Sequence, residues 1–275
     1  MAMLAENTCL IVSTYNWPEA LELTLKSILR QTQMPGQIII ADDGSREDTR
    51  ELIDRYSSKF AQGLQHVWHA DRGFRLAAIR NKAIAACQKD YIIQIDGDVI
   101  LHPQFVKDHL DLSSPGRLVQ GSRVMLGKRI SRKMLQGKKV KISILSPGIK
   151  RRENGIRSLA LARYFALRYT NRYPRYYARG ANMAFWKSDL IQVNGYNEAF
   201  EGWGHEDSDL TLRLLTYGVQ KAVLKFSAIV YHLYHPENPS KEKDVENQRI
   251  LAETLQKQTT WTNNGLDKYL SNHEQ

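Results

Sequence analysis

Two adjacent carboxylates, Glu206 and Asp207, follow a tryptophan framed by glycines, Trp203, and precede a run of helical periodicity at 208–217. This order predicts that both acids lie in the first turn of a helix, where free backbone N–H groups and the helix dipole favour negative charge. The flanking glycines let the backbone approach a bound molecule closely. Helix capping would also explain both acids, so the meaning of the pair depends on whether the rest of the chain forms a substrate site.

The composition is that of an ordinary globular protein, with 275 residues of which 42% are hydrophobic and 25% charged. A chain of this length can bury one large core or two small ones. No apolar run approaches the roughly 20 residues that a membrane-spanning helix needs, and the N-terminus shows no pattern of a secretory signal. Cys9 and Cys87 lie in apolar runs without CxxC spacing, which favours buried, reduced thiols and a cytoplasmic compartment.

The net charge of +10 is unevenly distributed along the chain. Residues 117–179, which we call the basic segment, contain 18 of the 39 Lys and Arg residues but only one of the 29 acidic residues, Glu153. The rest of the chain therefore carries 21 basic and 28 acidic residues. A basic segment on an acidic body predicts an anionic partner for that segment.

The first half of the chain alternates strand and helix signals. Helical periodicity begins at Pro18, passes through Tyr56 in a second run, and spans 76–87 in a third. Short apolar runs between them predict strands at 8–13, 37–41, 65–70 and 91–95. This order predicts an α/β fold with a mostly parallel central sheet flanked by helices.

Beyond residue 116 the pattern is less regular. Residues 127–155 are rich in Lys, Gly and Ser and predict a mobile loop or an excursion from the domain, whereas 158–171 predicts a helix. The tail, 240–258, predicts a polar helix that packs over the body. Further short strands are predicted at 183–186, 222–225 and 228–232.

Polar residues follow three of the predicted strands at the points where the strands end. Ligands of open α/β sheets bind beyond the carboxyl ends of the strands. The sequence therefore predicts that these side chains converge on one rim. They are Ser13 and Tyr15 after the first strand, Asp42 and Asp43 after the second, and Asp96 and Asp98 after the fourth.

The acidic tripeptide Asp96-Gly97-Asp98 is a candidate site for a divalent cation, because Mg²⁺ and Mn²⁺ take oxygen ligands. Alternate residues of an extended chain face opposite ways, so both carboxylates reach one ion only if the chain turns at Gly97. His232 or His235 would add a nitrogen ligand, and we prefer His232 because it ends an apolar strand. An ordinary turn and structural or surface histidines would explain the same residues without a metal.

A nucleotide could be held at the same rim. Asp42 and Asp43 can accept N–H bonds from a base such as uracil, Tyr15 can stack on the base, and Arg75 can neutralise phosphate. Turn capping, a core aromatic residue and a solvated charge are the alternatives for these positions. Arg80 lies on the predicted helix 76–87, and the sequence does not indicate which way it faces.

Taken together, the motifs resemble those of GT-A glycosyltransferases of the large inverting family 2. The C-terminal half is similar to β-1,4-galactosyltransferases and to the GalNAc-transferase modules of bacterial chondroitin polymerases. The motifs occur in family order over most of the chain, at 12–16, 41–45, 73–75, 80–81, 96–98, 180–182, 202–207 and 232–239.

The resemblance implies a role for each site residue. Glu206 would bind sugar hydroxyls, Asp207 would be the general base, and Trp203 would contact the donor or acceptor sugar. The metal, Mn²⁺ or Mg²⁺, would bind Asp98 directly and His232 from the far side, with Asp96 on the ribose or on the metal through water. The uridine and its phosphates would be held by Ser13, Tyr15, Asp43 and Arg75, with Asp42 beside them.

The activity that the resemblance implies is transfer of a hexose (Gal, GalNAc or Glc) from a UDP-sugar to a glycan or lipid-linked glycan, in bacterial surface polysaccharide or lipopolysaccharide assembly. The expected division of the chain is a nucleotide-sugar-binding half at 1–116, a basic excursion at 117–180, an acceptor and catalytic half at 181–239, and a helical tail at 240–275.

Other functions remain open from the residues alone. A nucleotidyltransferase acting on a sugar phosphate would share the acidic metal site, although no Gly-rich phosphate loop follows the first strand. A glycoside hydrolase would also use two carboxylates but needs no nucleotide rim. The basic segment, with its interleaved tyrosines, could bind nucleic acid, but the acidic body disfavours this. We favour docking on an anionic membrane surface or a phosphorylated lipid-linked glycan, as a cytoplasmic protein peripheral to the inner membrane face.

Overall fold

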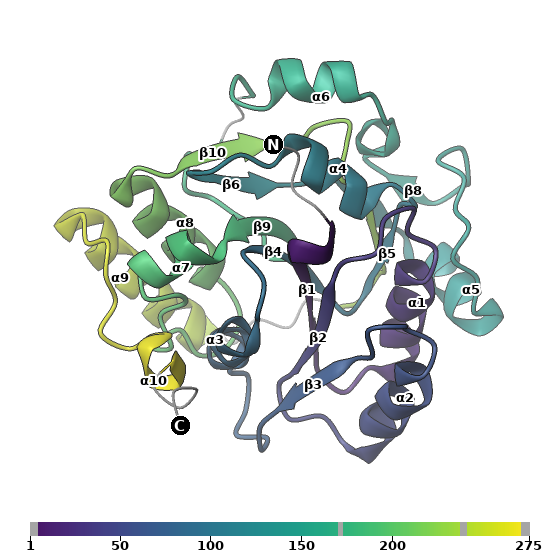
Figure 1. The fold of residues 1–275 in the computed structure, drawn as a ribbon, viewed down its shortest axis with the longest axis horizontal. Helices are drawn as coiled ribbons and strands as arrows, with labels where there is room; N and C mark the ends of the chain where they lie inside the picture. The colour runs from purple at the N-terminus through teal and green to yellow at the C-terminus, as the bar shows by residue number, and fades with distance from the viewer. Residues whose placement is uncertain (1–4, 170–172, 237–240, 271–275) are drawn as a thin grey trace.

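The computed structural model describes residues 5–169, 173–236 and 241–270 (Figure 1). Its core is a seven-stranded sheet with the order β10-β6-β9-β4-β1-β2-β3. All neighbouring strands pair in parallel except β9, which runs antiparallel to both β4 and β6. The predicted mostly parallel α/β sheet is therefore confirmed. The strands are β1 (Thr8–Thr14), β2 (Gln37–Asp42), β3 (Gln65–Trp68), β4 (Tyr91–Asp96), β6 (Arg117–Gln120), β9 (Asn182–Trp186) and β10 (Gln220–Val223).

Helices cover both faces of this sheet, so its central strands are apolar on both sides. In β1, Leu10 and Val12 pack against α1 (Pro18–Ile28), α2 (Glu47–Ser57) and α4 (Phe105–Leu112). The alternate residues Cys9 and Ile11 pack on the opposite face. That face is covered by α3 (Leu76–Ala86), α7 (Lys187–Gln192), α8 (Glu206–Tyr217) and α10 (Asp267–Leu270).

A second, four-stranded sheet lies beside the first, with the order β5-β11-β7-β8. Its pairing places His232 of β11 opposite Val99 of β5, directly after the acidic tripeptide. The small sheet thus brings His232, which is far from β4 in the sequence, close to the end of β4. Its strands are β5 (Val99–Leu101), β7 (Arg123–Leu126), β8 (Ile149–Lys150) and β11 (Val230–His232).

The expectation of a loop at 127–155 was wrong. This segment contains α5 (Lys128–Gly137), β8 and the short 3-10 helix η2 (Arg152–Gly155). Met134 and Ile149 are buried in a cluster that also contains Leu126 of β7. A few apolar side chains on one face are therefore enough to pack a helix whose other positions are mostly Lys and Arg, because those long side chains keep their charges in water.

The remaining elements differ from the predictions mainly in length. The helix predicted at 158–171 is α6 (Leu159–Phe165), and residues 170 and 171 lie outside the described residues. The strand predicted at 222–225 is β10, which lies two residues earlier, and the strand predicted at 228–232 is β11, which begins two residues later. The polar tail helix is α9 (Lys241–Lys257), with Ser240 outside the described part, and it packs through Leu251 on Phe200 and Leu212. Another 3-10 turn, η1 (Ala5–Asn7), precedes β1.

Both cysteines are buried and neither forms a disulfide, as predicted. Among the described residues, no helix combines the length and the apolar character needed to cross a bilayer.

Candidate active site

The ends of β4, β1 and β2 lie side by side at one edge of the large sheet. Ser13 pairs with Asp96, and Thr14 pairs with Asp42, so the polar residues that follow these strands occupy neighbouring rows. The α-helices α3 and α8 begin near this edge and contribute further polar side chains to it. The polar residues that follow these strands therefore lie along one edge of the sheet, as the sequence predicted.

Arg80 connects the residues of this rim, although sequence reasoning did not assign it a direction. The side chain extends from α3 and is only 1% exposed. One terminal nitrogen lies 2.9 Å from Oδ1 of Asp207 and 3.4 Å from Oε1 of Glu206, and the other lies 3.1 Å from Oδ1 of Asp96. Its Nε donates to the Ser13 hydroxyl at 3.3 Å. One guanidinium thus connects the end of β4 to the start of α8.

This cluster places one buried cation among three carboxyl groups, of which Glu206 and Asp207 are largely buried and Asp96 is 32% exposed. Burial and, to a smaller extent, the neighbouring Asp207 carboxylate together raise the pKa of Glu206 to about 8. Burial also raises the pKa values of Asp207 and Asp96, while Arg80 opposes the rise in both. Burial would lower the pKa of Arg80, but its carboxylate neighbours, Asp207 foremost, raise it. The raised pKa favours the protonated form of Glu206 at pH 7, and Arg80 lies closer to Asp207 and Asp96 than to Glu206.

The Asp207 carboxylate is fixed by donors from three directions. Besides Arg80, the backbone N–H of Gly180 donates to Oδ2 at 2.6 Å, and the hydroxyl of Tyr196 lies 3.3 Å from Oδ1. A Cβ atom at position 180 would lie 2.5 Å from Asp207 Oδ1, so only glycine allows this approach. The helix dipole at the start of α8 favours the same negative charge. A carboxylate held in this way is oriented before any ligand arrives.

The loop before α8 has an unusual backbone. Gly202, Gly204 and His205 all have positive φ angles, of 75°, 105° and 75°. Trp203 between them is 50% exposed. The tail helix α9 holds this loop, because the side-chain amide of Asn247 donates to the carbonyls of residues 201 and 204 at 3.1 and 3.0 Å. The sequence predicted that the tail packs over the body but did not indicate this contact.

Asp98, His232 and His235 form the only group of three or more potential metal ligands found among the described residues. Nε2 of His232 lies 3.5 Å from Asp98 Oδ2, and Nε2 of His235 lies 3.3 Å from the same oxygen. The second oxygen of Asp98, Oδ1, is buried and has no hydrogen-bond partner in the described part of the chain. Both histidines therefore lie within reach of one ion, whereas the sequence favoured His232 over His235.

These three residues fit a divalent metal by their chemistry. Nδ1 of His232 lies 2.8 Å from the carbonyl of Leu233, and Nδ1 of His235 lies 3.0 Å from that of Pro236. A proton on each Nδ1 leaves each Nε2 with a free lone pair, the arrangement usual for metal-binding histidines. A carboxylate with two imidazoles suits Mn²⁺. Asp96 is not in this group, because its carboxylate is directed to Arg80.

The two aspartates after β2 are buried and already bonded within the protein. Asp42 accepts the backbone N–H of Ser45 at 2.8 Å and lies 3.0 Å from Nε2 of His66. Asp43 lies 2.7 Å from Nε2 of His69 and accepts the backbone N–H of Arg75 at 2.9 Å. The two aspartates thus hold β3 and the start of α3 to this edge of the sheet.

Tyr15 and Arg75 are more open. Tyr15 is 44% exposed, and its hydroxyl donates to Asp71 at 2.9 Å, which leaves its ring face accessible. The guanidinium of Arg75 donates to the carbonyl of Ala70 at 2.9 Å, and its Nε has no partner among the described residues. Both side chains stand next to the Asp42-Asp43 pair, on the β2–β3 side of the rim.

Replacing Arg80 by methionine should destabilise the protein, because the largely buried Glu206 and Asp207 and the half-buried Asp96 lose their only shared cation. We expect the free energy of unfolding to fall by about 3–5 kcal/mol at pH 8, as for other broken buried pairs. The loss should shrink at pH 5, since the freed carboxylates have raised folded-state pKa values and bind protons more readily when folded than when unfolded. Denaturation of Arg80→Met against the exposed-site control Arg55→Met measures this. A loss below about 1 kcal/mol at pH 8 would show that the cluster is not needed for the fold.

Comparisons with known proteins agree with this architecture. The family model described as "Glycosyl transferase family 2" matches residues 9–173, and one described as "N-terminal domain of galactosyltransferase" matches 162–236. The hyaluronan synthase of Pasteurella multocida is 28% identical over 86% of this chain and 25% of its own length. The chondroitin synthase of Escherichia coli is 24% identical over 94% of this chain and 39% of its own. The chain thus spans about a quarter to two-fifths of the length of these curated relatives.

The fold comparison points the same way. The crystal structure of GalNAc-T7 with UDP, GalNAc and Mn²⁺ superposes with a TM-score of 0.67 at 14% identity, over 90% of this chain and 48% of that one. At this identity the likeness concerns the fold, which is the GT-A fold expected from the sequence. The family 2 model covers more than half of the chain, and the chain therefore belongs to glycosyl transferase family 2.

Proposed function

We propose that this family 2 protein is an inverting, metal-dependent hexosyltransferase that uses a UDP-sugar and a glycan acceptor. The observation that carries the proposal is the shared contact of Asp207 and Asp96 with one guanidinium. It brings a candidate general base and a candidate metal site, through Asp98, to the same edge of the sheet. The structure of GalNAc-T7 with UDP, GalNAc and Mn²⁺ supports the choice of donor and metal.

The chemistry follows from the positions of the acidic groups. Asp207 takes the proton of an acceptor hydroxyl while that oxygen forms a bond to the anomeric carbon and the bond to UDP breaks, which inverts the configuration at that carbon. Protonated Glu206 donates a hydrogen bond to the sugar, and Trp203 packs against it. Asp98, His232 and His235 would hold the metal, which offsets negative charge on the departing diphosphate. Arg75 adds a second positive charge on the nucleotide side.

The nucleotide is assigned to the open side of the rim at β2 and β3. Tyr15 offers an accessible ring face for the uracil, and Arg75 a partly unpartnered guanidinium for phosphate. Ser13, Asp43 and Asp42 shape this region, and Asp96 lies nearest the ribose. We assign residues 1–116 to the donor, 181–239 to the acceptor and catalysis, 117–180 to a basic excursion, and 240–275 to a supporting tail.

The transferred sugar is Gal, GalNAc or Glc, and assembly of a bacterial surface polysaccharide or lipopolysaccharide is the proposed setting. Two relatives are named as synthases of hyaluronan and chondroitin, which supports a role in polysaccharide assembly.

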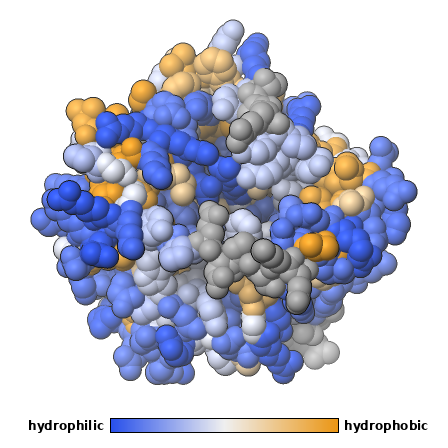
Figure 2. All heavy atoms as spheres, turned by 180° about the vertical axis from the view of Figure 1, so that it is seen from behind, coloured by the Kyte–Doolittle hydropathy of each residue, from blue (hydrophilic) through white to orange (hydrophobic). Residues whose placement is uncertain are grey.

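The basic segment also carries apolar side chains on its surface, around α6. Leu161, Tyr164 and Leu167 are exposed, and the exposed Arg163 and Arg168 belong to the same stretch. Figure 2, which views the molecule from behind, shows hydrophobic residues gathered at the upper edge, where α6 lies, next to hydrophilic ones. Apolar and cationic side chains in one patch are typical of proteins that bind anionic membrane surfaces. We therefore assign the protein to the cytoplasm, with peripheral binding to the inner membrane face.

Replacing Asp207 by asparagine should abolish most turnover and retain UDP binding, because the carboxamide keeps the shape of the side chain but cannot take the proton. We expect a fall of about 10²–10⁴-fold in Mn²⁺-dependent UDP release. UDP-Gal, UDP-GalNAc and UDP-Glc are each tested, with and without oligosaccharide acceptors. Calorimetry with UDP and Mn²⁺ checks the donor site, and Asp54→Asn on the exposed face of α2 is the matched control. Near-normal turnover in Asp207→Asn would exclude this residue as the base.

Replacing Asp98 by asparagine should weaken Mn²⁺ binding in the presence of UDP, because one charged ligand is lost. We expect at least about a tenfold loss of affinity, since even residues that only orient metal ligands contribute 10–100-fold. His232→Ala and His235→Ala should each weaken Mn²⁺ as well, and Asp54→Asn should not. Manganese titration followed by electron paramagnetic resonance measures free ion directly. Unchanged Mn²⁺ affinity in all three variants would show that Asp98, His232 and His235 are not the metal ligands.

Membrane binding can be measured by flotation with liposomes. The protein should float with vesicles containing phosphatidylglycerol and not with phosphatidylcholine alone, and roughly 0.5 M salt should release it because surface charges are then screened. The double substitution Arg163→Gln and Arg168→Gln should reduce flotation, whereas Arg55→Gln on α2 should not. Equal binding to neutral and anionic vesicles would contradict the role of the basic patch.

A further inference from the structure

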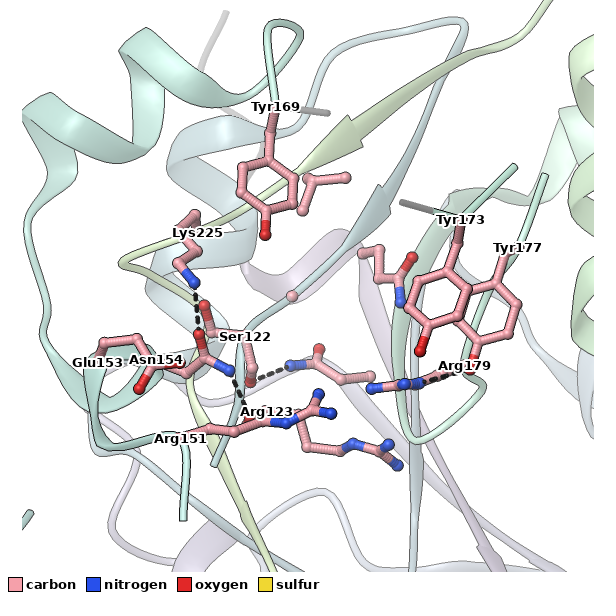
Figure 3. A pocket seen from close by; sticks show the side chains of 14 residues that line it. Ser122, Arg123, Arg151, Glu153, Asn154, Tyr169, Tyr173, Tyr177, Arg179 and Lys225 are labelled. Carbon is pink, nitrogen blue, oxygen red and sulfur yellow. Dashed lines mark hydrogen bonds between the residues drawn. The ribbon is translucent and has the colours of Figure 1, made fainter. Parts of the chain in front are cut away.

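A cavity of about 240 Å³ opens next to the candidate active site, on the side away from the proposed nucleotide. It lies beyond β6 and β9, whereas the nucleotide is assigned to β1, β2 and β3 at the other end of the same sheet. Figure 3 shows Tyr173 and Tyr177 on one side of the cavity and Lys225 and Asn154 on the other. The volume suits a group of about the size of one sugar residue, since pockets for drug-sized ligands begin at about 300 Å³.

The lining of this cavity is strongly cationic. Arg123, Arg151, Arg179 and Lys225 line it, and Glu153 is the single carboxylate among the lining residues. None of the four cations forms an ion pair with any residue within 5–169, 173–236 and 241–270. Most of the positive charge of the cavity is therefore available to a ligand.

Arg123 is the most informative of these cations. Its Nε is buried without a hydrogen-bond partner among the described residues. Burial lowers the pKa of Arg123, and the nearby Arg179 lowers it further. A buried donor with no acceptor is costly unless something binds to it. An anion between Arg123 and Arg179 would accept a hydrogen bond from this Nε and would offset the repulsion between the two guanidinium groups.

The cavity also adjoins the reacting groups. Arg179 precedes Gly180, whose backbone N–H donates to Asp207 at 2.6 Å. Arg123 lies close enough to Asp96 and Asp98 for their charges to raise its pKa against the effect of burial. Arg123 and Arg179 therefore link the cavity to the surroundings of the proposed base and the proposed metal ligands, the side from which an acceptor would enter.

The aromatic side chains add a surface for a sugar ring. Tyr173 and Tyr177 are stacked with ring centroids 4.4 Å apart, and Nε of Arg179 lies 3.0 Å from the Tyr177 hydroxyl. Across the cavity, Nζ of Lys225 donates to Asn154 Oδ1 at 2.8 Å, which holds the amine at the wall. Rigid aromatic faces with a few convergent polar groups are typical of a small-molecule pocket.

We propose that this cavity binds an anionic group, a carboxylate or a phosphate, on the acceptor glycan, with Arg123 and Arg179 as its charge partners. The inference rests on the proposed function, because it names the acceptor class of the same site. A guanidinium pairs with carboxylate or phosphate through two parallel hydrogen bonds, which gives orientation as well as affinity. A neutral acceptor would leave Arg123 and Arg179 unpaired.

The test uses the full chain with its donor site already filled by UDP and Mn²⁺, so that an added anion is directed to the cavity. Glucose, glucuronic acid and glucose 6-phosphate are titrated by calorimetry. At least one of the two anionic sugars should bind about tenfold more tightly than glucose, through charge-assisted bonds. A preference for glucuronic acid identifies a carboxylate acceptor, and a preference for glucose 6-phosphate identifies a phosphorylated one.

Two substitutions in the cavity lining test whether the preference for an anionic sugar arises from this cavity. Arg123→Gln and Arg179→Gln should each weaken the preferred anionic sugar about tenfold while glucose is unaffected, and Arg132→Gln on the exposed side of α5 should change neither. Equal binding of all three sugars, or a preference that survives both variants, would overturn the inference. Failure of UDP to bind with Mn²⁺ in the unaltered protein would instead contradict the proposed donor site, and the two failures are therefore distinguishable.

Discussion

The buried guanidinium of Arg80 is the interaction on which the candidate site depends. It contacts Asp96 at the end of β4 and both Glu206 and Asp207 at the start of α8. Burying a charge is costly unless it is paired and hydrogen-bonded, and here one cation contacts three acidic side chains, so that the two aspartates lie close together around one positive charge. The two regions matched by separate family models, 9–173 and 162–236, meet at this residue. The contact thus joins the strand that precedes the proposed metal ligands to the helix that carries the proposed base.

Backbone geometry does the remaining positioning. Gly180 brings a backbone N–H to Asp207 at a distance that any Cβ would prevent. The positive φ angles of Gly202, Gly204 and His205 turn the chain so that Trp203 is exposed in front of α8. This loop is held by the tail helix through Asn247, so a segment that carries none of the proposed catalytic residues still supports the site.

Much of the fold was predictable from the sequence, because parallel strands buried on both faces appear as continuous apolar runs such as 8–13 and 91–95. The rim was predictable too, since the polar residues that end parallel strands must meet at one edge. The direction of Arg80 was not, because α3 carries two cations, Arg80 and Lys82, among alanines and isoleucines, and nothing in the pattern indicates which of them is buried. The pairing of His235 with His232 depends on how the chain leaves β11, and α5 was missed because few apolar residues mark its buried side.

The most direct test of the account is an experimental structure of the protein with UDP and Mn²⁺. We predict that the ion is bound by Asp98 with His232 and His235, and that the diphosphate lies between Arg75 and this ion with its terminal phosphate facing Asp207. An ion or a diphosphate bound on a part of the surface from which Asp207 cannot reach the transferred sugar would contradict it.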